Sequence, residues 1–153
     1  MMSSEKPKVI DRIYTDAKYD DFLDMSYIFG YDTHKIERKD QFLFAVALGY
    51  KMGKPTPISG KKKRQLIWTS YLDEEDDMPL LYAIAYEETN DINIVSKSDE
   101  ALNYVYKLAE EYANTGLSFL KNFEENCSYE NYLKKFEKKI NDHLKSIEED
   151  EDS

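Results

Sequence analysis

Six positive charges crowd residues 51–64 of a chain whose net charge is −10. The stretch "YKMGKPTPISGKKKR" contains no acid, and further aromatic residues follow it. Clustered cations beside aromatic rings can bind a phosphate backbone or an acidic protein surface. The acids elsewhere would repel duplex DNA, so any DNA contact would be confined to this stretch. The candidate binding residues are Lys51, Lys54, Lys61, Lys62, Lys63, Arg64, Trp68 and Tyr71. The alternative is a solvated loop without a binding role, paired with the acids at 73–77.

Other stretches hold side chains that could bind a phosphate or a metal ion, but in weaker patterns. "GYKMGK" at 49–54 lacks the spacing, the hydroxyl residue and the following helix of a phosphate-binding loop. Asp32, Glu37 and Lys39 are the residue types of a Mg²⁺-dependent nuclease, but they lie in a polar stretch flanked by helices. The acids at 73–77 lack the glycine and the later glutamate of a calcium loop.

The sequence supports nucleophilic catalysis or a zinc site no better than it supports a phosphate or metal site. Cys127 is the only cysteine, and His34 and His143 are the only histidines. These three residues cannot complete a Cys/His zinc site, and a lone cysteine forms no internal disulfide. We therefore predict no catalytic residues, no metal and no cofactor. The sequence also lacks an apolar run of about 20 residues and a secretory leader, which predicts a cytoplasmic protein that does not span a membrane.

Length and composition indicate one folded domain. The chain has 153 residues, of which 41% are hydrophobic and 14% aromatic, enough for a real core. Both ends are polar, and the run "EEDED" at 148–152 repels itself. We predict disordered tails at 1–9 and 148–153 around a single domain at 10–147.

The segment 41–52 is apolar on nearly all sides, which is typical of a buried helix. Asp40 could cap it, Gly53 could end it, and the prolines that follow forbid its continuation. We expect the centre of the domain to hold Phe42, Leu43, Val46, Ala47 and Tyr50. The cations that follow would then lie on a loop that leaves the core.

The remaining periodic segments also favour helices. Apolar residues recur at helical spacing around 16–30, 77–91, 96–123 and 128–147, with Leu80 among those expected to face inward. "INIV" at 92–95 reads as a brief extended link, and 64–72 fits a strand or a helix equally well. The prediction is an all-α, compact single-domain bundle of about five to seven helices around helix 41–52, which allows one short extended segment.

Two segments resemble the DNA phosphorothioation-associated protein 4 family. "DQFLFAVALGYKMGKPTPI" at 40–58 is similar to that family's apolar helix ending in Ala-x-Gly-Tyr-Lys-x-Gly. "LAEEYANTGLSFL" at 108–120 looks like its Glu-Glu-Tyr-Ala-Asn-x-Gly segment. The resemblance implies an accessory component of a system that places sulfur in the host DNA backbone and restricts unmarked phage DNA. It carries over no catalytic residue.

Together these features predict a non-enzymatic adaptor of a DNA modification or anti-phage defence system. It would contact a larger protein subunit of that system through the helix at 128–147 or through residues 51–72. Direct nucleic-acid binding through the basic residues at 51–64 is the first alternative. An acidic DNA mimic that inhibits a DNA-binding enzyme is the second.

Overall fold

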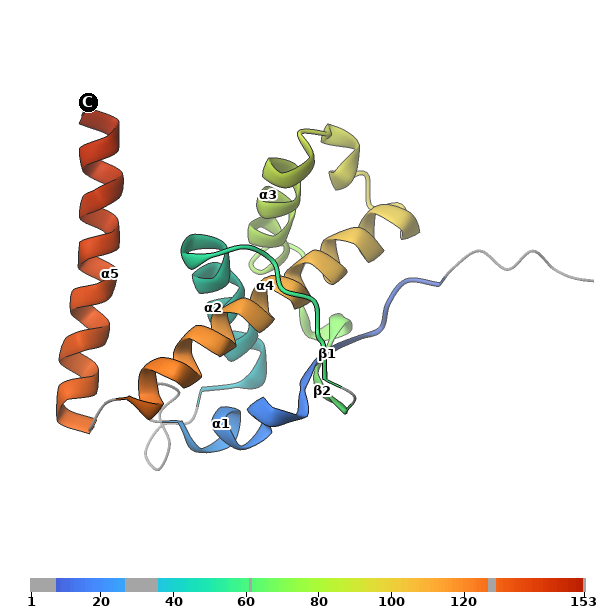
Figure 1. Cartoon of the computed structure of the whole chain (residues 1–153). Coiled ribbons are helices and arrows are strands. Elements are labelled where there is room, and N and C mark those ends of the chain that lie inside the picture. Colours follow the sequence, from blue (N-terminus) through green and yellow to red (C-terminus); the bar gives the residue numbers. More distant parts are fainter. Residues whose placement is uncertain (1–7, 27–35, 61, 127–128, 153) are drawn as a thin grey trace, which may run out of the picture. The chain divides into compact units, whose positions relative to one another are not determined.

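The computed structural model describes residues 8–26, 36–60, 62–126 and 129–152. It divides the chain into two units, Met1–Ser118 and Phe119–Ser153, which are described separately below. The main elements in chain order are β1 (Arg12–Asp16), α1 (Asp20–Met25), α2 (Arg38–Met52), β2 (Lys63–Trp68), α3 (Met78–Thr89), α4 (Asp99–Glu125) and α5 (Tyr129–Asp152) (Figure 1). Short 3-10 helices occupy Ala17–Tyr19, Thr69–Tyr71 and Ile92–Val95. The described chain is mostly helical, as predicted, but it is not purely α.

A two-stranded sheet corrects the all-α prediction. β1 pairs antiparallel with β2, and Leu66 is an extra residue in β2 opposite the step from Ile13 to Tyr14. β2 also settles the ambiguous stretch 64–72, which is a strand followed by a 3-10 turn. Some fifty residues separate the two strands, so no local periodicity could reveal their pairing. The sheet also places Lys63 and Arg64 on a strand, where the sequence had predicted a loop.

The core of the first unit is built around α2, α3 and the first five turns of α4. Apolar side chains from each of them are shielded from solvent, together with residues of the sheet and of α1. The largest fully buried ones are Ile13, Leu23, Phe42, Val46, Ile67, Met78, Leu81, Val105 and Leu117. Burial of such side chains is the main favourable term in folding.

Two glycines let α2 and α4 cross at close range. A Cβ atom on Gly49 would overlap the carbonyl oxygen of Tyr112, and one on Gly116 would overlap the carbonyl oxygen of Ala45. The backbones therefore touch where any side chain would force them apart. Gly116 lies within α4 without ending it, so its cost in helix propensity is offset by this close packing.

The helices α2 and α3 run side by side in the same direction. At their starts the ammonium of Lys39 lies 3.2 Å from a carboxylate oxygen of Asp77. Near their ends burial raises the pKa of Tyr50, and the carboxylate of Glu87 lies close enough to the Tyr50 hydroxyl to raise that pKa further. Eleven residues of α2 and ten of α3 separate these two points, about 16 Å and 15 Å of helix, so the helices run alongside each other for roughly three turns.

Several predictions about helix ends need correction. The residue that precedes α2 is Glu37, not Asp40, and Gly53 ends α2 with an extended backbone. The start of α4 is capped by Ser98, whose hydroxyl accepts the backbone N–H of Ala101, whereas Ser96 had the capping-box spacing in the sequence. Residues 92–95 form a 3-10 helix where an extended link was expected, because the Asp91 carboxylate accepts the N–H of Asn93 and tightens the chain into a turn.

The second unit contains the end of α4 and the whole of α5. The ring of Phe123 packs edge-on against Phe136, with 5.6 Å between the ring centroids, and stacks on Phe119 at 6.1 Å. The ammonium of Lys139 lies over both α4 rings. α5 continues to Asp152, through the acidic run that the sequence assigned to a disordered tail. Lys145 lies four residues before Glu149, a spacing that supports helix there.

Candidate functional site

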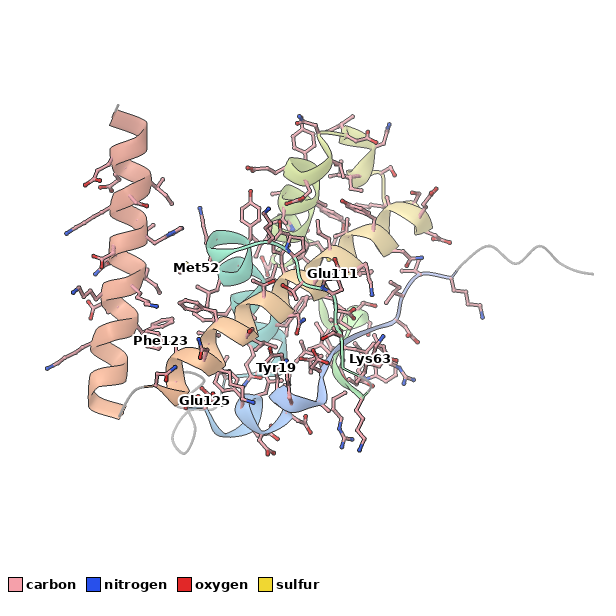
Figure 2. The ribbon with its side chains drawn as sticks, in the orientation of Figure 1. Tyr19, Met52, Lys63, Glu111, Phe123 and Glu125 are labelled. Carbon is pink, nitrogen blue, oxygen red and sulfur yellow. The ribbon has the colours of Figure 1, made fainter. Side chains whose placement is uncertain are left out.

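The structure divides the basic stretch into two groups. Lys51 lies in the last turn of α2 and Lys54 just after it, whereas Lys62 precedes β2 and Lys63 and Arg64 begin it. In Figure 2 the labelled Met52 and Lys63 lie on opposite sides of α4, because the intervening segment crosses that helix. Lys61 lies outside the described residues. The five cations that the structure describes therefore do not form one patch.

Polar side chains of α4 hold the crossing segment in place. The amide nitrogen of Asn114 donates to the carbonyl oxygens of Thr56 and Pro57, at 3.1 and 3.3 Å. The Thr115 hydroxyl contacts the Lys54 carbonyl oxygen at 2.5 Å and the Thr56 hydroxyl at 2.7 Å. The N–H of Thr56 donates to the Glu111 carbonyl oxygen at 3.1 Å. These bonds fix the separation of the two cationic groups.

The second cationic group, Lys62 to Arg64, is exposed but has acidic neighbours. The Arg64 guanidinium lies 3.8 Å from a carboxylate oxygen of Asp20. Asp16 pairs in register with Lys63, and its buried carboxylate accepts the N–H of Gly60 at 2.8 Å. Part of the positive charge is therefore compensated within the protein.

The two aromatic candidates are not assembled into a stacking platform. The Arg12 guanidinium lies 4.4 Å from the centroid of the Trp68 ring, because Arg12 and Trp68 are register partners in the sheet. One face of that ring is thus already covered by a cation. Tyr71 is 62% exposed on the following 3-10 turn.

The acids at 73–77 serve local structure, and none of them forms an ion pair with the described residues of the basic stretch. Asp73 accepts the N–H groups of Glu75 and Asp76, which forms the turn into α3. Glu74 lies 2.7 Å from Lys97, and this contact lowers the pKa of Glu74. The hydrogen bond with Asp77 raises the pKa of Lys39. Within the described residues, no three His, Cys, Asp or Glu side chains are placed to hold a metal ion.

The nuclease, phosphate-loop and thiol interpretations gain nothing from the structure. Lys39 is engaged with Asp77 at the start of α2, and Glu37 precedes the same helix, so they do not lie on adjacent strands. Of the glycines in "GYKMGK", Gly49 lies within α2 and Gly53 ends it, so neither of them starts a helix. Asp32, His34 and Cys127 lie outside the described residues, and His143 lies on α5.

Sequence reasoning missed an apolar groove between α2 and α3. Its volume is about 190 Å³, and it is lined mainly by Ala47, Tyr50 and Lys51 from α2 and by Leu80, Ala83 and Glu87 from α3. Leu80, predicted to face inward, is 38% exposed. Phe44, one turn before Ala47 on α2, is 39% exposed, so α2 is not buried on all sides as the sequence suggested.

The groove has small residues at its centre and charged residues at one end. Ala47 and Ala83 leave room between the two helices, where larger side chains would fill it. Burial, with the hydrogen bond to Glu87 second, raises the pKa of Tyr50, which stays a neutral donor at physiological pH. The signal in the sequence was the spacing of 80, 83 and 87 on α3, which puts an apolar and an acidic side chain on one face.

With this geometry the chain is a mostly helical protein that presents a helix-lined apolar groove and no assembled catalytic constellation among its described residues. It matches the family model described as DNA sulphur modification system-associated protein 4 over residues 36–152, and it belongs to that family. Neither the curated proteins nor the solved structures gave a match. The match includes both segments that carried the resemblance, and these contain the two crossing glycines and Asn114.

Among the described helices, none is both long enough and apolar enough to cross a bilayer.

Proposed function

We propose that this protein is a non-catalytic adaptor of a DNA sulphur modification system, and that it binds another protein of that system through the α2–α3 groove. The observation that carries the proposal is the exposed apolar surface between these two helices, in a chain whose family is described by its association with such a system. Defence against phage DNA is the role that such a system would serve in the cell.

The shape of the groove suits an amphipathic helix of the partner. Two parallel helices leave a linear furrow between them, which matches one apolar stripe of a third helix. The partner's large side chains would rest over Ala47 and Ala83, with Leu80 and Phe44 beside them. The charged groups of Lys51 and Glu87 at the groove's end would set the direction of the bound helix.

The C-terminal helix offers a second contact for the same adaptor role. Leu144 of α5 is 49% exposed, and Ile140 and Ile147 share its face at spacings of four and three residues. Polar and charged residues occupy the rest of the helix surface. This face therefore stays a candidate for partner binding alongside the groove.

The two alternative functions have weaker support. Direct DNA binding needs the cations to act together, but Lys51 and Lys54 lie across α4 from Lys62 to Arg64. Mimicry of DNA needs rows of free carboxylates, but Glu74, Asp77 and Glu110 each face a lysine within 3.3 Å.

The test is co-purification from native host cells after nuclease treatment, with bound proteins identified by mass spectrometry. The wild-type chain is compared with Leu80→Glu in the groove and with Ile92→Glu, an aliphatic residue 68% exposed outside it. We expect a protein of the modification system to co-purify with the wild type and with Ile92→Glu, and to be lost with Leu80→Glu. Equal recovery with Leu80→Glu, or recovery that needs intact DNA, would refute the groove as the contact.

A further inference from the structure

The two outer edges of the small sheet differ in how their backbone groups are hydrogen-bonded. In an antiparallel pair, successive residues point their backbone groups alternately toward the partner strand and away from it. The bonds from Ala17 N to Lys62 O and from Thr69 N to Asp11 O fix which residues face inward. By this alternation the backbone groups of Ile10 and Tyr14 point away from β2, toward the outer edge of β1.

Side chains of α4 close that outer edge of β1. The carboxylate of Glu110 accepts the Tyr14 N–H at 2.9 Å, and the side-chain oxygen of Asn103 accepts the Ile10 N–H at 2.6 Å. Glu110 is itself buried and lies 3.3 Å from the ammonium of Lys107. The backbone donors of this edge are thus satisfied within the chain.

The outer edge of β2 has no such closure by any residue that the structure describes. The same alternation points the N–H and C=O groups of Lys63 and Gln65 away from β1. Among the described residues, none hydrogen-bonds to these outward groups. Residues 63–65 are exposed, whereas Leu66 and Ile67 are buried and anchor the strand. A rigid strand therefore offers open backbone groups at its first half.

The charge of this edge selects the kind of segment that could pair with it. Lys62 and Lys63 are exposed, and neither ammonium has an ion pair within the described part of the chain. Lys63 shares its face with Gln65, and Lys62 shares the opposite face with Arg64. A segment added beside β2 would meet lysines on both of its faces, in a protein whose net charge is −10.

We propose that β2 is a docking edge for an extended acidic segment of another protein, which adds a third strand next to Lys63 and Gln65. Main-chain hydrogen bonds to Lys63 and Gln65 supply the pairing, and the ammonium groups of Lys62 and Lys63 select carboxylate side chains. This surface is separate from the α2–α3 groove, so the adaptor would hold two segments at two places. It also gives a role to Lys62 and Lys63, the exposed cations at this edge.

The probe is a fluorescent peptide of alternating valine and glutamate, titrated against the purified full-length protein by anisotropy. We expect binding that weakens as salt rises. A peptide of the same sequence with alternate amides N-methylated keeps its charge but cannot pair as a strand, and should bind at least about tenfold more weakly. Equal binding of the two peptides, or no binding of either at low salt, would overturn the proposal.

Three variants of the protein locate the site. The double variant Lys62→Ser, Lys63→Ser should weaken peptide binding. The double variant Lys51→Ser, Lys54→Ser makes the same change in net charge and should leave peptide binding unchanged. Gln65→Pro removes only an N–H that faces the open edge, a position where proline is tolerated, and should weaken binding without changing the urea midpoint. Equal losses in both lysine pairs would indicate unspecific attraction and overturn the proposal.

Two other occupants are tested in the same experiment. Tighter binding of a single-stranded oligonucleotide than of the peptide would assign the edge to phosphate and contradict the proposal. Self-association that is lost in Gln65→Pro would show pairing between two copies of β2, which also contradicts it. Because the groove residues are unchanged in Lys62→Ser with Lys63→Ser and in Gln65→Pro, failure here leaves the co-purification test of the adaptor role unaffected.

Discussion

The two faces of α2 carry similar types of residue but lie in opposite environments. On the inner face Ala45 and Gly49 meet the backbone of α4 so closely that Gly49 has no room for a side chain. On the outer face Phe44 is 39% exposed, and Ala47 lines an open groove. An apolar residue on α2 can therefore belong to the core or to a binding surface, and its type alone does not tell which.

The difference shows what each face requires. The inner face depends on shape, because a backbone contact between two helices tolerates no added atom. The outer face, under the proposed adaptor role, has to stay apolar and open so that a partner can bind there. Substitutions should thus separate stability from binding when they are made on one face or the other.

The largest effect is expected at the crossing. Gly49→Ala and Gly116→Ala should each lower the free energy of unfolding by about 2 kcal/mol or more, because the added methyl overlaps a carbonyl oxygen. At an ordinary helix position the same change stabilises by about 1 kcal/mol, so the sign itself is diagnostic. Urea unfolding followed by circular dichroism measures it. The exposed Ser118→Ala is the control, and a stabilised Gly49→Ala would show that the helices do not touch.

A smaller loss is expected where α4 holds the crossing segment. Asn114→Ala removes the donor to the Thr56 and Pro57 carbonyl oxygens and should cost about 1–3 kcal/mol, since Asn114 is buried. Hydrogen exchange at the Thr56 amide should also speed up as the segment loosens. The exposed Asn141→Ala on α5 serves as the control. An unchanged Thr56 exchange rate would mean that other contacts fix the segment.

A pH-dependent loss is expected from Tyr82. Burial, with the hydrogen bond to Glu74 second, raises the pKa of Tyr82 to about 12, while the unfolded chain ionises near pH 10. The unfolded state therefore binds fewer protons in this range, and stability should fall as pH rises from about 10 to 12. Urea midpoints for Tyr82→Phe should fall less steeply than those of the wild type. Tyr71→Phe, at an exposed ring, should leave the slope unchanged, and equal slopes for all three would contradict the burial of Tyr82.

The smallest effect on stability is expected on the outer surface. Leu80→Glu should change the free energy of unfolding by no more than about 0.5 kcal/mol, because Leu80 is partly exposed and an acid suits the first turn of a helix. Ile92→Glu should change the free energy of unfolding by a similarly small amount in the same urea titration. A loss of more than about 2 kcal/mol for Leu80→Glu would place this residue in the core, as the sequence first suggested.

Local patterns in the sequence captured the helices but not the sheet. The apolar run at 41–52 and the repeat of Leu102, Val105 and Ala109 identified α2 and α4, because helical periodicity is a local property. The pairing of residues 12–16 with 63–68 is long-range, and the bulge at Leu66 breaks the alternation that would reveal a strand. The roles of Gly49 and Gly116 emerge only when the two helices are brought together.

The candidate site was foreseen only in part. The cations do cluster in the sequence, but residues 54–58 cross α4 and so separate them in space. The path of that segment cannot be predicted from composition. Arg12 stacks on Trp68 because the sheet register makes them partners, which the sequence could not show. The groove depends on which face of α2 meets α4, so it too becomes visible only in three dimensions. The role of the eight candidate residues therefore stays a prediction.

Site-specific photo-crosslinking in living host cells tests the adaptor role most directly. A photoreactive amino acid placed at Ala83, in the groove, is compared with one at Ile92, outside it. The account predicts that the probe at position 83 crosslinks to a protein of the DNA sulphur modification system, and that the probe at position 92 does not. Crosslinks to that protein from position 92 but not from 83, or no crosslink from 83 to any protein of the system, would contradict it.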